Sequence, residues 1–215
     1  MKKIFLAIFV FVFLFGCAGI PVRKALQEDI GVVAGKIEGN QFSGIRYPFK
    51  VSVPPPWKLT TEFPGFMEGL GYDKPSPTDK EQTEVYAYNP ETRSNISFDF
   101  TPAGRYATFS QAKIERLTSI ATESLKEELD KEHGKGVVKP EVHPTEPISL
   151  KGVQYAAKKY VTYTVRGTKR EQGWIYGFTE PYQIFILYMV LEKEGTADRE
   201  GLKKILDSFE VMTKK

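Results

Sequence analysis

The segment 184–191 constrains the fold of this chain more than any other, because it is apolar at every position. A β-strand points successive side chains to opposite faces of its sheet. A strand that is apolar on both faces needs a packed layer on each of them, so it is predicted to lie in the middle of a sheet. The two sets of side chains are Ile184, Ile186, Tyr188 and Val190 on one face and Phe185, Leu187, Met189 and Leu191 on the other.

Two long segments rich in β-forming residues precede this strand. Residues 154–166 lead through a tight connection at Gly167 to residues 168–178, and a turn at 179–181 leads to residues 183–192. The strand–helix–strand alternation of a parallel sheet is absent, so these three segments are predicted to form an antiparallel meander. Residues 142–150 contain two prolines and are predicted to form an edge strand.

The rest of the chain supplies shorter strands and two helices. Alternating apolar residues predict strands at 49–53, 84–88 and 95–100. Ser110 is a suitable N-cap for a helix that runs without Pro or Gly to Gly134, and its apolar stripe includes Ile120. A final helix is expected to begin at Thr196 or Asp198 and to continue through Leu206. The fold class is therefore predicted as α+β, with an antiparallel sheet flanked by helices on both faces.

The first residues of the chain have the order of a secretory signal. Lys2 and Lys3 precede an uninterrupted apolar run of 12 residues, Ile4–Phe15. The run is shorter than the roughly 17–25 residues of a transmembrane helix, although continuing to Ile20 gives 17 residues and an uncleaved anchor as an alternative. An ordinary signal peptide with an incidental cysteine is the second alternative.

The sequence Leu14-Phe15-Gly16-Cys17 resembles the lipobox of bacterial lipoproteins. The resemblance implies cleavage between Gly16 and Cys17, and a lipid on the Cys17 thiol. Residues 1–16 are thus interpreted as signal peptide, 17–45 as lipidated N-terminus and linker, and 46–215 as the folded domain. A small residue, Ala18, follows the cysteine, and under enterobacterial-type sorting it favours the outer membrane, facing the periplasm.

Charge and cysteine content narrow the function classes. Without Lys2 and Lys3 the chain keeps 28 basic and 27 acidic side chains, so no electrostatic feature favours a nucleic-acid partner. Cys17 is the only cysteine, which excludes a disulfide within the chain. The expected partners are a membrane, through the N-terminal acyl chains, and an envelope protein, with the domain itself monomeric.

Four features in a fixed order resemble the PsbP-like fold over residues 47–212. They are the opening strand and its Pro-x-Trp turn at Phe49–Trp57, a helix of about six turns after the early strands, the strand and turn at Pro147–Tyr155, and the helix end at Leu206–Phe209. This resemblance implies a binding or assembly role without catalysis. It assigns no cofactor and no metal ligands to positions of this chain.

Residue patterns that carry chemistry are few. The two histidines, His133 and His143, lack the close spacing of a metal site, and both are interpreted as surface residues. Ser110 and Lys113 match the Ser-x-x-Lys of penicillin-binding enzymes, but the accompanying motifs are missing, so Ser110 is interpreted as a helix cap. No catalytic residue is predicted, and the chain is interpreted as a non-enzyme.

Aromatic residues provide the remaining candidate site. They are either core residues under a helix or the lining of a binding surface, and the sequence leaves both alternatives open. The leading hypothesis is a lipid-anchored envelope protein that supports a protein complex, and the alternative is a carrier with a pocket between sheet and helix. The candidate residues are Phe66, Tyr72, Trp174, Tyr176 and Tyr182.

Overall fold

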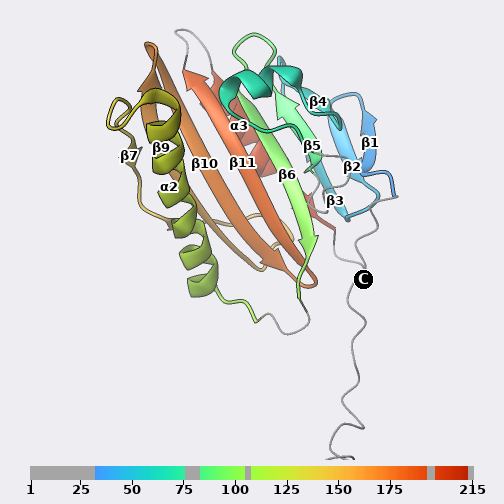
Figure 1. Ribbon diagram of the computed structural model, residues 1–215. Helices are drawn as coiled ribbons and strands as arrows, with labels where there is room; N and C mark the ends of the chain where they lie inside the picture. Colours follow the sequence, from blue (N-terminus) through green and yellow to red (C-terminus); the bar gives the residue numbers. More distant parts are fainter. Residues whose placement is uncertain (1–31, 76–82, 105–107, 193–196, 213–215) are drawn as a thin grey trace, which may run out of the picture.

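A long antiparallel sheet runs through the middle of the molecule (Figure 1). The computed structural model describes residues 32–75, 83–104, 108–192 and 197–212. The order across the sheet is β4 (Lys58–Thr60), β5 (Thr83–Tyr88), β6 (Asn95–Pro102), β11 (Tyr182–Glu192), β10 (Thr168–Thr179), β9 (Tyr155–Val165) and β7 (Glu141–Val142), with β8 (Glu146–Pro147) also paired to β9.

The meander β9–β10–β11 forms as predicted. Its strands pair in the antiparallel direction over their whole length, and Arg166 and Gly167 take positive φ angles of 49° and 79° in the tight connection between β9 and β10. The strand β11 lies between β10 and β6, in the middle of the sheet. The central position that was predicted for this strand from its two apolar faces is therefore confirmed.

The helix α2 (Gln111–His133) covers one face of the sheet, across β9 and β10 (Figure 1). Ser110 caps it by accepting a hydrogen bond from the Lys113 amide, as predicted. Leu125 and Leu129 pack with Trp174 under the helix. Ile120 was expected in this stripe but is 54% exposed. At about 100° per residue it lies roughly 120° away from Ile114, on the solvent side.

The opposite face of the sheet carries α3 (Asp198–Ser208) and a second, smaller sheet. The main core fills the space between them, and its centre is a cluster of phenylalanine rings. Phe49, Phe98 and Phe209 have ring centroids 5.5–6.3 Å apart. The small sheet has the order β1 (Gly35–Glu38), β2 (Gln41–Gly44), β3 (Phe49–Ser52) and β12 (Glu210–Val211).

The strands β1 and β2 correct the predicted domain boundary. Residues 17–45 were interpreted as a linker, but β2 pairs with β3 and Phe42 is completely buried against Phe49, at a centroid distance of 5.1 Å. Residues 35–44 are thus part of the folded domain. The sequence signal is weak here, because each strand has only four residues and each includes a glycine. Residues 17–31 lie outside the described part of the chain.

Residues 61–75, which follow β4, fold back onto the large sheet. They contain the short 3₁₀ helix η1 (Gly65–Leu70), in which Met67 is fully buried. Phe63 packs edge-on against Tyr86, and the ring of Phe66 lies 5.5 Å from that of Tyr88. The molecule therefore has three layers, with α2 and η1 on one face of the large sheet and α3 with the small sheet on the other. This arrangement confirms the predicted α+β class.

Candidate functional site

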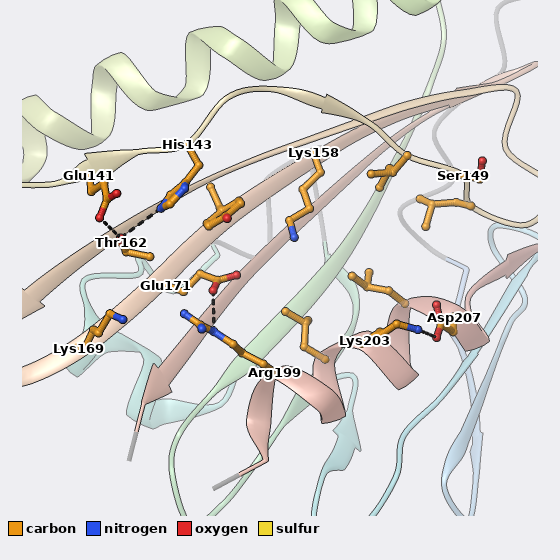
Figure 2. Close-up of a pocket in the computed structure, with 15 residues that line it drawn as sticks. Glu141, His143, Ser149, Lys158, Thr162, Lys169, Glu171, Arg199, Lys203 and Asp207 are labelled. Atoms are coloured by element: carbon orange, nitrogen blue, oxygen red, sulfur yellow. Dashed lines mark hydrogen bonds and ion pairs between the residues drawn. The ribbon is translucent and has the colours of Figure 1, made fainter. Parts of the chain in front are cut away.

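A pocket of about 630 Å³ lies between the large sheet and α3 (Figure 2). We call it the α3 pocket. Its walls come from two strands, one helix and the edge segment between α2 and β9. The lining residues are Lys158, Tyr160 and Thr162 of β9, Lys169 and Glu171 of β10, Arg199, Leu202, Lys203, Leu206 and Asp207 of α3, and Glu141, His143, Ile148, Ser149 and Leu150 of the edge segment.

Strand alternation explains which side chains enter this pocket. Lys158, Tyr160 and Thr162 are two residues apart, so they share the face of β9 that is opposite to α2. The register places Thr162 beside Glu171, and Tyr160 beside Gly173. The face of β9 that the pocket uses is thus mixed in character, with an ammonium, a phenol and a hydroxyl in a row.

Gly173 gives this face its shape. It lies between Tyr160 of β9 and Tyr188 of β11, and a side chain at this position would meet the Tyr188 ring at 2.2 Å. The Tyr188 ring therefore lies over the glycine and reaches toward β9. A glycine inside a strand weakens the strand, and here the compensation is this close approach of the ring.

Lys158 lies over the two tyrosine rings. Its Nζ is 4.8 Å from the centroid of Tyr160 and 5.7 Å from that of Tyr188, distances at which a cation is attracted to the face of an aromatic ring. Figure 2 shows the Lys158 side chain pointing into the space between β9 and α3.

The carboxylates of the pocket are engaged by other groups. Glu171 is buried and accepts a hydrogen bond from the Tyr188 hydroxyl at 3.1 Å, and its second oxygen lies 2.9 Å from Nε of Arg199. Arg199 also pairs with Glu192. Burial is the main cause that raises the pKa of Tyr188 above its ordinary value, and the neighbouring Glu171 carboxylate adds to the effect. At the other end of the pocket, Lys203 pairs with Asp207 at 2.6 Å.

The histidines lie on different layers of the molecule. His143 stacks on Tyr160 at the rim of the α3 pocket, with a centroid distance of 4.1 Å, and its Nε2 is 3.3 Å from Oγ1 of Thr162. His133 is the last residue of α2, and its Nε2 lies 3.7 Å from Oε1 of Glu132. Within the described residues, no group of three or more His, Cys, Asp or Glu side chains is arranged to hold a metal ion.

Ser110 and Lys113, the two residues of the Ser-x-x-Lys match, both interact at the start of α2. Ser110 Oγ accepts the Lys113 amide at 3.3 Å, and the Lys113 ammonium donates to the carbonyl of Thr108 at 2.8 Å while lying 4.7 Å from the Phe109 ring. Both side chains thus stabilise the first turn of α2.

The five candidate aromatic residues do not form one surface. Trp174 is buried under α2, and Tyr72 shares a smaller cavity of about 270 Å³ with it. Tyr176 contacts Phe185 on the same face, and Phe66 packs on Tyr88. Tyr182 lies with Tyr47 and Phe100 on the opposite face of the sheet.

Among the residues that line the α3 pocket, His143 was considered from the sequence and interpreted as a surface residue, and none was predicted to bind a ligand. The available signals were the alternation of Lys158, Tyr160 and Thr162 along β9 and the position of Gly173 inside β10. Neither signal indicates that α3 packs against this face of the sheet. The predicted signal-peptide and lipidation residues, Gly16 and Cys17, lie outside the described residues. None of the helices in the described residues combines the length and apolar character that crossing a membrane requires.

Comparison with solved structures identifies the fold. The chain is similar to cyanobacterial PsbP from Synechocystis sp. PCC 6803, with a TM-score of 0.50 and 12% identity over 86% of this chain and 96% of that one. It is also similar to LpqN of Mycobacterium tuberculosis, a protein involved in cell envelope biogenesis, with a TM-score of 0.50 and 13% identity over 77% and 84% of the two chains. No family model and no curated protein sequence matches. The domain has a PsbP-like fold, as its sequence motifs predicted.

Proposed function

We propose that this chain is an exported, lipid-anchored binding protein of a bacterial envelope that holds a small amphipathic molecule in the α3 pocket, without catalysing a reaction on it. The observation that carries the proposal is the pocket itself, at about 630 Å³. Pockets that bind small molecules have volumes of roughly 300–1,000 Å³. The carrier alternative, with a pocket between sheet and helix, is therefore the better-supported function.

The lining of the α3 pocket supports an amphipathic ligand. Leu202 and Leu206 of α3 and Ile148 of the edge segment contribute apolar side chains to the lining, while Lys158 and the paired charges of Glu171 and Arg199 contribute polar ones. A lining with both kinds of side chain accommodates a molecule with a polar head and an apolar body. The envelope location rests on the lipobox-like sequence around Cys17, and the fold shared with an envelope-biogenesis protein is consistent with it.

Native mass spectrometry of the full-length protein, gently extracted from envelopes, tests the ligand. A co-purifying small molecule is expected, and Leu206→Trp should remove it by filling the pocket. Ile120→Trp is the matched control, because it adds the same ring to an exposed position on α2. Retention of the ligand by Leu206→Trp, or its loss from both variants, would count against the α3 pocket.

The anchor is tested separately. Cys17→Ser should abolish incorporation of labelled palmitate and release the protein from the membrane fraction. Continued labelling of that variant, with unchanged membrane association, would contradict lipidation at Cys17.

Support of a protein assembly is the second proposed function. Its structural support is the exposure of two apolar side chains beyond the end of α2, since Val137 is 69% exposed and Val142 is 53% exposed. Crosslinking from position 137 in intact envelopes should give one defined protein adduct. A result with no adduct, or the same pattern from the exposed position 33, would contradict this role.

A further inference from the structure

Lys158 is the cation of the α3 pocket whose charge is not matched by a protein carboxylate. Within the described part of the chain its ammonium lies over the rings of Tyr160 and Tyr188 and makes no ion pair, although the register places Glu146 of β8 beside Lys158. Each of the other three basic residues that line the pocket, Lys169, Arg199 and Lys203, has an acidic partner.

The carboxylates of the pocket are held away from Lys158. Arg199 engages Glu171, Lys203 engages Asp207, and Oε2 of Glu141 accepts from the Thr162 hydroxyl at 3.4 Å. Figure 2 draws these three pairs with dashed lines, and none of these lines reaches Lys158. A half-buried ammonium gains from a nearby anion, because attraction between opposite charges is stronger where water is partly excluded.

The surroundings of Lys158 also limit the shape of the missing anion. Figure 2 shows the Lys158 side chain pointing from β9 into the space between β9 and α3, and Leu202 and Leu206 of α3 line the same pocket. An anion that reaches Lys158 therefore brings whatever is attached to it against apolar side chains. A small inorganic anion would leave these apolar side chains in contact with water.

We propose that the ligand of the α3 pocket is an acidic amphiphile, whose anionic head pairs with Lys158 and whose apolar chain lies against Leu202, Leu206 and Ile148. This inference rests on the proposed function, since it names the chemical class of the molecule that the pocket holds. The head is a carboxylate or a phosphate, because both accept hydrogen bonds from an ammonium. The tyrosine rings hold the Lys158 ammonium in place before the ligand arrives.

Photocrosslinking in envelope membranes tests this proposal with the full-length, membrane-bound protein. Three probes carry the same diazirine-bearing dodecyl chain and end in a carboxylate, a phosphate or a neutral alcohol. Adducts are mapped by mass spectrometry to the segments that line the pocket. An acidic probe is expected to label α3 residues about tenfold more than the alcohol does, which corresponds to roughly 1.4 kcal/mol for a charged hydrogen bond. The comparison between carboxylate and phosphate tells which acid is the natural head.

Variants of Lys158 assign the effect to its charge. Lys158→Met should lower labelling by the acidic probes about tenfold and leave labelling by the alcohol unchanged. Lys158→Arg should keep most of the labelling. Lys204→Met is the matched control, because it removes a lysine of α3 that pairs with Glu200 and does not line the pocket.

The experiment distinguishes a failure of the acidic head from a failure of the α3 pocket as a ligand site. Equal labelling of the pocket by all three probes, unaffected by Lys158→Met, would overturn the acidic head while leaving the pocket as a ligand site. Absence of adducts in the pocket with every probe would overturn both this inference and the proposed function.

Discussion

The Nε atom of Arg46 lies 3.4 Å from Oε1 of Glu84, whose side chain is completely buried. Arg46 precedes β3 of the small sheet and Glu84 belongs to β5 of the large sheet, so the pair joins the two sheets. Burial raises the pKa of Glu84 from 4.5 to about 7, although the Arg46 charge opposes this shift. The fold therefore contains a carboxyl group that titrates near neutral pH.

This pKa predicts a pH dependence of stability. Between pH 4.5 and 7 the folded chain keeps a proton on Glu84 that the unfolded chain releases. The free energy of unfolding should therefore fall as pH rises through this window, by up to about 1.4 kcal/mol per pH unit from this group, and level off above it. Urea unfolding at a series of pH values should show a shallower decline for Glu84→Gln. Glu62→Gln, at an exposed position, should keep the wild-type slope.

Identical slopes for Glu84→Gln and the wild-type protein would show that Glu84 is ionised throughout this range. The direction of the effect is the informative part, because carboxylates that are stabilised in the folded state give the opposite slope.

The hydrogen bonds of Asp198 are predicted to contribute strongly to the stability of the domain, because they attach α3 to the rest of the fold. Its two oxygens accept hydrogen bonds from Asn89 at 2.7 Å and from Ser94 at 2.6 Å, and all three residues are buried. Asp198→Ala leaves these donors without an acceptor and should lower the free energy of unfolding by about 3 kcal/mol. Asp207→Ala, which removes an exposed ion pair of the same helix, should cost no more than about 0.5 kcal/mol. Equal losses would contradict the assignment.

Gly201 of α3 is required by the indole of Trp57. A side chain at this position would meet Nε1 of Trp57 at 2.3 Å, and Trp57 is buried in the core. Alanine raises helix propensity by about 1 kcal/mol relative to glycine, but overpacking of a rigid core typically costs roughly 1–3 kcal/mol. Gly201→Ala should therefore destabilise the domain. Gly69→Ala, where nothing lies within 4 Å, should not, and thermal unfolding of both variants compares them directly. A higher melting temperature for Gly201→Ala would show that Trp57 moves freely.

Truncation tests the corrected domain boundary. A chain of residues 32–215 keeps β1 and β2 and should unfold cooperatively. A chain of residues 46–215 loses the fully buried Phe42, whose truncation alone typically costs about 3–5 kcal/mol, and should be markedly less stable. Denaturant unfolding followed by tryptophan fluorescence measures the difference. Equal stability would place β1 and β2 outside the cooperative unit.

The aromatic residues show where prediction from the sequence was limited. Strand alternation puts Trp174 and Tyr176 on one face of β10, but only the packing of α2 on that face shows that Trp174 is a core residue. Tyr72 joins Trp174 at a cavity although about 100 residues separate them, because η1 folds back over the sheet. The start of α3 is a further example. Thr196 or Asp198 was expected to begin the helix. The Asp198 carboxylate accepts hydrogen bonds from Asn89 and Ser94, and Ala197 is the N-cap, while Thr196 lies outside the described residues.

The long strands, the central place of β11, the start of α2 and the α+β class could all be predicted from the sequence. These features follow from side-chain periodicity and capping, which act between residues close in the chain. The inclusion of β1 and β2 in the small sheet, and the pocket that α3 and the Lys158 face of β9 form together, could be seen only in the folded structure. Those features depend on contacts between distant segments, and whether a polar strand face meets solvent or a helix is fixed by packing, which periodicity does not encode.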